Sequence, residues 1–85
     1  MPKIIMYATG SCPYCRMAEN LLRSKGVETI EKIRIDLNPE LRAEMMTKTG
    51  RRTVPQIYIG EKHVGGGYDD LSLLDRSGEL STLLT

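Results

Sequence analysis

The residues best suited to chemistry in this sequence are two cysteines separated by two residues. They stand in the order Cys12-Pro13-Tyr14-Cys15 and are the only cysteines among the 85 residues. An apolar run precedes them and helical spacing follows, so Cys12 falls at the cap position of a predicted helix. The unpaired N–H groups and the positive dipole end at a helix start favour a thiolate over a thiol. Cys15 lies one turn further on, close enough for a disulfide, which gives thiol–disulfide exchange its attacking and its resolving sulfur.

Two other interpretations of the cysteine pair compete with redox chemistry. A structural zinc site usually needs four ligands, whereas this sequence offers two cysteines and a single histidine, His63, far along the chain. Alternatively, both cysteines are inert core residues on one face of a helix. A Cys-x-x-Cys pair between a strand and a helix is typical of a redox site in a cytosolic protein. We therefore favour a dithiol oxidoreductase and predict no metal site.

Length and charge limit the classes of function. The 85 residues allow one domain, which we place at residues 1–85. The net charge of +1, from 12 Lys and Arg against 11 Asp and Glu, offers no long-range attraction to nucleic acid or to a membrane surface. The N-terminal apolar run is too short for a signal peptide, and no stretch approaches the length of a membrane span. We expect a cytoplasmic monomer, in the compartment that keeps thiols reduced.

The elements that position the cysteines follow from hydrophobic spacing. The short apolar, β-branched run from Lys3 to Tyr7 predicts a strand that is buried on both faces. Pro13 suits the first turn of a helix, which we expect to continue to about Lys25 and to stop at Gly26. At helical spacing, one side of this helix carries Tyr14, Met17, Ala18, Leu21 and Leu22.

A second strand and a second helix follow along the chain. Isoleucines recur among charged residues over 30–35, which predicts a strand that is less completely covered. Asn38 and Pro39 open a helix with a side-chain cap and a first-turn proline, and Gly50 ends it. The predicted core-facing residues of this helix are Leu41, Met45 and Met46.

A hairpin and a third helix complete the predicted fold. Strands at 56–59 and from His63 onward are joined by a tight turn at 60–62, and His63 is expected on the surface. A helix follows over 69–76, and the C-terminal segment is expected to pack back as a partial helix. The inward positions of these two segments are Leu71, Leu74, Leu80, Leu83 and Leu84.

The resulting order, β-α-β-α-β-β-α, defines the fold class. The first three elements form a βαβ unit, so their two strands should be parallel with a right-handed crossover. The hairpin adds an antiparallel pair. We therefore predict an α/β fold with a four-stranded mixed sheet and helices on both faces.

Two further motifs accompany the cysteine pair. They are Thr53-Val54-Pro55 and, after it, Gly66-Gly67-Tyr68-Asp69-Asp70. In their order and spacing the three motifs resemble the glutaredoxin family, in particular the dithiol class of small bacterial members with a Cys-Pro-Tyr-Cys centre. The resemblance covers the whole chain, whereas thioredoxin itself has a Trp-Cys-Gly-Pro-Cys centre and this sequence contains no Trp. It implies a thioredoxin-like fold and a glutathione-dependent oxidoreductase with Cys12 and Cys15 as catalytic residues.

The resemblance also implies a glutathione site. A cis bond between Val54 and Pro55 would leave the Val54 main chain free to pair with the cysteine of glutathione. The N–H groups of Tyr68 and Asp69 would hold the γ-glutamyl carboxylate, and an Asp side chain its ammonium group. From the residues alone, Pro55 is equally a strand-start proline and the aspartates are helix caps. The implied glutathione-binding residues are Tyr14, Arg52, Thr53, Val54, Pro55, Gly67, Tyr68, Asp69 and Asp70.

The sequence departs from the family pattern in two places. Most dithiol glutaredoxins have a Lys three residues before the first Cys, where Thr9 stands here. The missing charge is expected from Arg16, or from Arg51 and Arg52, a pair that is otherwise typical of a solvated surface. Arg52 is assigned to the glycine-end carboxylate of glutathione. The run Gly65-Gly66-Gly67 is one Gly longer than usual, which we expect to loosen this loop and to weaken glutathione binding.

The predicted reaction uses Cys12 to attack glutathione mixed disulfides and Cys15 to resolve the intermediate formed with protein disulfides. The partners are glutathione, as reductant and co-substrate, and disulfide-containing or glutathionylated proteins. Two alternatives stay open. One is an electron donor to ribonucleotide reductase that a thioredoxin reductase reduces. The other is a carrier of a [2Fe–2S] cluster ligated by glutathione and Cys12, although family members of that kind usually lack the proline found at Pro13.

Overall fold

The structure, a computed structural model, describes residues 2–85, so the first residue of the predicted domain lies outside the described residues. Its elements are β1 (Ile4–Ala8), α1 (Pro13–Ser24), β2 (Glu31–Arg34), α2 (Pro39–Thr49), β3 (Gln56–Ile59), β4 (Lys62–Gly65), α3 (Tyr68–Ser77) and α4 (Glu79–Leu84). This order confirms the predicted succession, and the C-terminal segment folds as the short helix α4. The predicted boundaries of strands and helices are met to within one residue.

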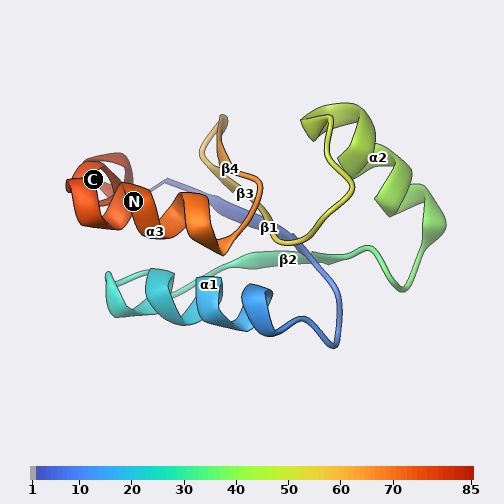
Figure 1. Ribbon diagram of the computed structural model, residues 1–85, viewed down its shortest axis with the longest axis horizontal. Helices are drawn as coiled ribbons and strands as arrows, with labels where there is room; N and C mark the ends of the chain where they lie inside the picture. The colour runs from blue at the N-terminus through green and yellow to red at the C-terminus, as the bar shows by residue number, and fades with distance from the viewer. Residues whose placement is uncertain (1) are drawn as a thin grey trace.

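The four strands form one mixed sheet in the order β2-β1-β3-β4. β1 pairs with β2 in parallel and with β3 antiparallel, and β3 and β4 form the antiparallel hairpin. The predicted four-stranded mixed sheet is therefore confirmed. β1 is an inner strand with a neighbour on each side, and most of its residues are buried. Its C-terminal end leads directly into the loop that carries the cysteines (Figure 1).

Helices cover both faces of the sheet, as predicted. Side chains alternate across a strand, so β1 supplies Met6 to one buried cluster and Tyr7 to the other. The larger cluster includes Ala18 and Leu22 of α1, Leu71 of α3, and Leu80 and Leu84 of α4. The smaller cluster joins Tyr7 and Ile35 to Met45 of α2. α1 and α2 therefore lie on opposite sides of the sheet, and Met45 is confirmed as a core residue (Figure 1).

The apolar side of α1 that the spacing identified is buried only in part. Ala18 and Leu22 are fully buried, but Tyr14 is 59% exposed and Met17 is 43% exposed. Helical spacing determines which side of a helix is apolar, whereas the extent of the covering layer determines how many turns of that side are buried. The first turns of α1 lie at the open end of the sheet, beside the cysteine loop.

The predicted surface position of His63 is also corrected. Its ring is partly buried, because it packs on Tyr58 with the ring centroids 5.1 Å apart. Its Nε2 atom lies 2.8 Å from Oε1 of Gln56, a fully buried side chain. The hairpin signal in the sequence predicts that the two strands pair. It does not predict that His63 contacts the buried side chain of Gln56.

Candidate active site

The cysteine turn lies where β1 ends and α1 begins (Figure 1). Cys12 has an extended backbone, with φ −120° and ψ 100°, and caps α1, because its Sγ accepts a hydrogen bond from the Cys15 N–H at 3.0 Å. Pro13 occupies the first helical turn, where no intrahelical N–H bond is required. Cys12 and Cys15 form a disulfide with their Cα atoms 5.2 Å apart. The cap position and the proximity of the two sulfurs agree with the prediction.

The two cysteines differ in their access to solvent. Cys15 is 6% exposed and belongs to the larger buried cluster, whereas Cys12 is partly buried at the edge of that cluster. Cys12 also lines a small surface recess together with Ser11, Pro13 and Arg16. A nucleophilic thiol must reach its substrate, so the geometry suits attack by Cys12 and an intramolecular resolving step by Cys15.

A carboxylate that follows β2 holds the loop before Cys12. The Gly10 N–H donates to Asp36 Oδ2 at 3.2 Å, and the Arg34 guanidinium donates to both Asp36 oxygens at 2.8 and 2.7 Å. The guanidinium holds the pKa of the Asp36 carboxyl well below its usual range. A Cβ at residue 10 would overlap this guanidinium, so the Arg34 side chain lies directly against Gly10. We call these contacts of Arg34 and Asp36 with Gly10 the Arg34–Asp36 brace, and it was not predicted. Its sequence signal is the two charged residues at the end of β2, which is parallel to β1.

A polar recess of about 180 Å³ lies on the side of the cysteine turn toward β2, and residues of both α1 and β2 line it. Its charged lining residues include Arg16, Glu19 and Lys32, and Thr9 lines it as well. Lys32 Nζ lies 2.7 Å from Glu19 Oε1, and this hydrogen bond lowers the pKa of the Glu19 carboxyl. Of the three arginines expected to replace the family Lys, only Arg16 lines a recess that also contains Cys12.

On the other side of the cysteine turn lies a groove of about 440 Å³. It brings together Tyr14 of α1, the segment from Thr53 to Pro55 that precedes β3, and the start of α3. Its full lining is Tyr14, Arg51, Thr53, Val54, Pro55, Gly66, Gly67, Tyr68, Asp69 and Asp70. We call it the Val54 groove. Eight of the nine positions predicted to bind glutathione line it, and the ninth, Arg52, does not.

The arginine that lines the Val54 groove is Arg51. Both arginines are exposed, but only Arg51 lines the groove, so the structure brings Arg51, and not Arg52, to the site. The two arginines are neighbours in an irregular segment between α2 and β3, where no periodicity predicts which side chain faces inward. A Cβ at Gly66 would overlap the Arg51 guanidinium, which therefore packs directly on the glycine run.

The peptide bond between Val54 and Pro55 is cis, as the family resemblance implied. Pro55 is buried, and Val54 is partly buried against both hydrophobic clusters. Among residues 2–85, neither the N–H nor the C=O of Val54 makes a hydrogen bond. The Val54 main chain therefore offers an unpaired donor and an unpaired acceptor at the groove.

The start of α3 forms the opposite wall of the groove. Gly67 occupies the cap position and provides no side-chain cap, so the first N–H groups of α3 have no capping oxygen. Asp69 and Asp70 lie in this first turn, and Asp70 Oδ2 accepts a hydrogen bond from the Gly66 N–H at 3.0 Å. A helix start of this kind is suited to binding an anion.

Two of the three glycines in the run 65–67 lie against neighbouring side chains. Gly65 ends β4 with φ +156°, and a Cβ there would come within 2.5 Å of the Asp70 Cβ. Gly66 is held by Asp70 and is covered by Arg51. Each of these two glycines therefore accommodates a neighbouring side chain, and the expected weakening of glutathione binding stays a prediction.

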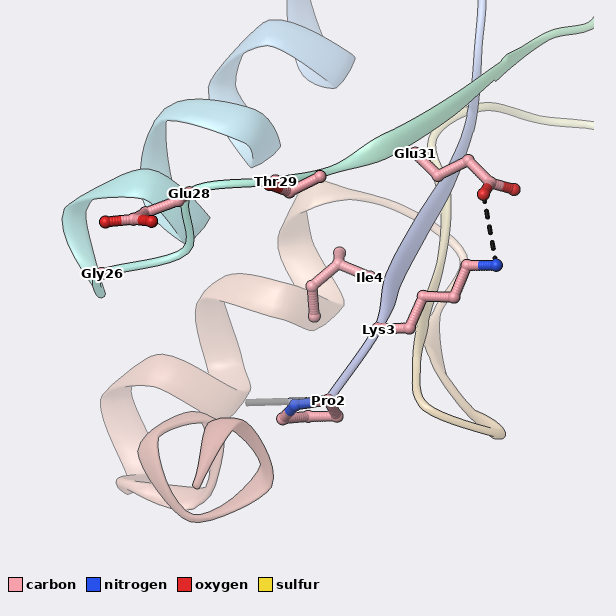
Figure 2. Close-up of a pocket in the computed structure, with 7 residues that line it drawn as sticks. All are labelled: Pro2, Lys3, Ile4, Gly26, Glu28, Thr29 and Glu31. Atoms are coloured by element: carbon pink, nitrogen blue, oxygen red, sulfur yellow. Dashed lines mark ion pairs between the residues drawn. The ribbon is translucent and has the colours of Figure 1, made fainter.

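A further recess, of about 480 Å³, lies at the other end of the sheet (Figure 2). Its lining residues are Pro2, Lys3, Ile4, Gly26, Glu28, Thr29 and Glu31, and Lys3 Nζ lies 3.2 Å from Glu31 Oε1. These residues lie at or just before the N-terminal ends of the parallel strands β1 and β2, whereas the cysteines follow the C-terminal end of β1. The lining contains no cysteine, and we call it the far recess.

Comparison with known proteins decides the family. The family model described as Glutaredoxin matches residues 4–64. The chain belongs to the glutaredoxin family. A glutaredoxin of Pseudomonas aeruginosa is 53% identical over 85 residues, which cover 100% of this chain and 99% of that protein.

Solved glutaredoxin structures share the fold of this glutaredoxin. The solution structure of glutaredoxin from Brucella melitensis has a TM-score of 0.84 at 49% identity, and the match covers 99% of this chain and 89% of that one. The crystal structure of the buckwheat glutaredoxin–glutathione complex has a TM-score of 0.87 at 29% identity, over 98% of this chain and 76% of that one. This glutaredoxin therefore has the thioredoxin-like fold and is a thiol–disulfide oxidoreductase with a redox-active disulfide. Within residues 2–85, no helix is long and apolar enough to cross a membrane.

Proposed function

We propose that this glutaredoxin reduces glutathione mixed disulfides through Cys12 and protein disulfides through Cys12 and Cys15, with glutathione as its reductant. The observation that carries the proposal is the Val54 groove, which joins an unpaired strand-like main chain to an uncapped helix start on one side of the cysteine turn. The buckwheat relative with the same fold was crystallised with glutathione.

Each part of glutathione has a counterpart in the groove. The N–H and C=O of Val54 pair with the main chain of the cysteinyl residue, as an added strand would. The N–H groups of Tyr68 and Asp69 bind the γ-glutamyl carboxylate, and the side chains of Asp69 and Asp70 face its ammonium group. Arg51 replaces Arg52 as the partner of the glycine-end carboxylate, because its guanidinium lines the groove.

The reaction on a glutathionylated protein runs through one mixed disulfide. The Cys12 thiolate attacks the sulfur of glutathione, the old disulfide breaks, and the protein thiolate leaves and takes a proton from water. A second glutathione thiolate attacks the glutathione sulfur bound to Cys12, which forms glutathione disulfide and returns Cys12 as a thiolate. The Cys15 N–H, which contacts Cys12 Sγ in the oxidised protein, stabilises that thiolate each time it is released.

The reaction on a protein disulfide requires Cys15. Cys12 attacks one sulfur of the substrate and forms a mixed disulfide, and Cys15 then attacks Cys12, which releases the substrate as a dithiol. The Cys12–Cys15 disulfide that remains is reduced by two glutathione molecules. Every residue in this scheme comes from one chain, so a monomer suffices, and the cytoplasm supplies the reducing conditions.

Single-cysteine variants test this assignment in a glutathione-coupled assay. Cys12→Ser should abolish reduction of a glutathionylated peptide and of a protein disulfide. Cys15→Ser should retain the first activity and lose the second, because only the second needs a resolving sulfur. Turnover by Cys12→Ser, or loss of both activities in Cys15→Ser, would contradict the proposal.

The same assay separates the alternative functions. If thioredoxin reductase sustains turnover and glutathione does not, the protein is a donor of the ribonucleotide reductase type. An anaerobically purified protein with visible charge-transfer absorption would instead indicate a [2Fe–2S] carrier. We expect turnover with glutathione and a colourless protein.

A further inference from the structure

Gln56 is the one buried polar side chain identified within residues 2–85, and it has 0% exposure. It directly follows Pro55 and begins β3. Its Nε2 donates to the Thr53 carbonyl oxygen at 2.8 Å and approaches Thr53 Oγ1 at 3.3 Å. Its Oε1 lies 2.8 Å from Nε2 of His63 in β4. A buried amide is stable only when it is hydrogen-bonded, and this one has partners on both sides.

The hydrogen-bond pattern fixes the orientation of both side chains. A main-chain carbonyl only accepts, so the NH₂ group of Gln56 must face Thr53 and its oxygen must face His63. That oxygen also only accepts, so Nε2 of His63 must carry a proton. The His63 ring is held in turn by its packing on Tyr58. The chain of contacts therefore runs from the β3–β4 hairpin to Thr53.

This chain of contacts ends at the Val54 groove. The Gln56 side chain bonds to Thr53, three residues earlier, and therefore links the two ends of the Val54-Pro55 pair. Thr53, Val54 and Pro55 all line the groove, whereas Gln56 and His63 do not. A binding segment without secondary structure of its own recognises its ligand well only when surrounding contacts hold it in place.

We propose that Gln56, oriented by His63, is a positioning residue that holds the Thr53–Pro55 segment in the conformation that binds glutathione. The inference rests on the proposed function and deepens it, because it assigns recognition of the glutathione moiety to a side chain outside the groove. Gln56 acts on binding and not on the sulfur chemistry. Its loss should therefore raise the KM for glutathionylated substrates and leave kcat nearly unchanged.

The first test compares Gln56→Leu with the wild type on a glutathionylated peptide. Leu has a similar volume but no hydrogen bonds, and losing them should raise KM about tenfold while kcat changes less than about twofold. Reduction of the Cys12–Cys15 disulfide by dithiothreitol, which has no glutathione moiety, should keep its wild-type rate. The matched control is Tyr7→Phe, which removes the hydrogen bond from the Tyr7 hydroxyl to Glu44 Oε2 and should leave KM unchanged.

The second test uses His63, whose side chain is only partly buried and belongs to neither hydrophobic cluster. His63→Phe retains a ring against Tyr58 but cannot donate to Gln56, and should raise KM about threefold. His63→Gln, whose side-chain NH₂ can donate, should restore a KM close to that of the wild type. If Gln56→Leu does not fold, this pair decides: a KM that rises in His63→Phe and recovers in His63→Gln supports the proposal, and an unchanged KM in His63→Phe overturns it.

Two further outcomes are separable. Nitrogen chemical shifts of His63 in the wild type should show a proton on Nε2, and a neutral ring protonated only on Nδ1 would overturn the proposal. If the wild type saturates with the glutathionylated peptide but Gln56→Leu folds and keeps its KM, this inference fails alone. If the wild type shows no preference for the glutathionylated peptide over the same peptide in a disulfide with a small thiol, the proposed function itself fails.

Discussion

The Val54 groove and the far recess are nearly equal in volume, at about 440 and 480 Å³, yet they differ in what lines them. The far recess, at the N-terminal strand ends, presents side chains such as the ion pair of Lys3 with Glu31 (Figure 2). The groove presents unpaired main-chain groups of Val54 and an uncapped helix start beside the cysteine turn. In α/β sheets ligands usually bind at the carboxyl ends of the parallel strands. The groove lies at that end of β1, because the antiparallel strand β3 begins there. Volume therefore does not distinguish the two recesses, whereas oriented polar main-chain groups do.

The largest expected difference between the two regions concerns their carboxylates. Asp70→Ala removes both the hydrogen bond to the Gly66 N–H and the proposed partner of the substrate ammonium. We expect kcat/KM for a glutathionylated peptide to fall about 30-fold, or about 2 kcal/mol, as a loss of this kind usually costs. Steady-state kinetics measure the change.

The matched variant in the far recess is Glu31→Ala. The Lys3–Glu31 pair is exposed, and such pairs contribute at most about 1 kcal/mol to stability. The kcat/KM of Glu31→Ala for the glutathionylated peptide should stay within about twofold of the wild type. Equal losses in the two variants would remove the distinction between the two recesses.

A smaller effect distinguishes the two neighbouring arginines. Gly66→Ala places a Cβ against the Arg51 guanidinium and should push it out of the groove. We expect KM for the glutathionylated peptide to rise about fivefold, as it should in Arg51→Ala, because each change removes one exposed charged contact. The double variant should be no worse than either single variant, since both act on the same guanidinium.

Arg52→Ala is the control for that prediction. Its side chain is exposed and lies outside the groove lining, so KM should change less than about twofold. A larger effect at Arg52 than at Arg51 would restore the assignment made from the sequence and would place the glycine-end carboxylate elsewhere.

The fold was predictable because each element carries a local signal. Pro13 and Gly26 bracket the first helix, Asn38 and Gly50 bracket the second, and alternating apolar residues mark the strands. The positions of Cys12 and Cys15 follow from the same signals, since a cap and the residue one turn later are defined by the helix start. The family motifs then identified most of the groove.

The remaining features depend on contacts between distant segments. Arg51 and Arg52 are adjacent and chemically identical, so only the folded loop shows which one faces the groove. Gln56 occupies a position that reads as an ordinary strand residue, and its partner His63 is seven residues away on the next strand. The Arg34–Asp36 brace on Gly10 likewise joins two segments that only the parallel pairing of β1 and β2 brings together.

The central claim is that the start of α1 stabilises a thiolate at Cys12. It is tested most directly by the pH dependence of thiolate absorbance, or of alkylation rate, for Cys12 in the reduced Cys15→Ser protein. We expect the thiolate to form with a midpoint below neutral pH, well under the value of about 8.5 for an ordinary cysteine. A midpoint at or above about 8.5 would contradict it, because Cys12 would then be no better a nucleophile than a free thiol.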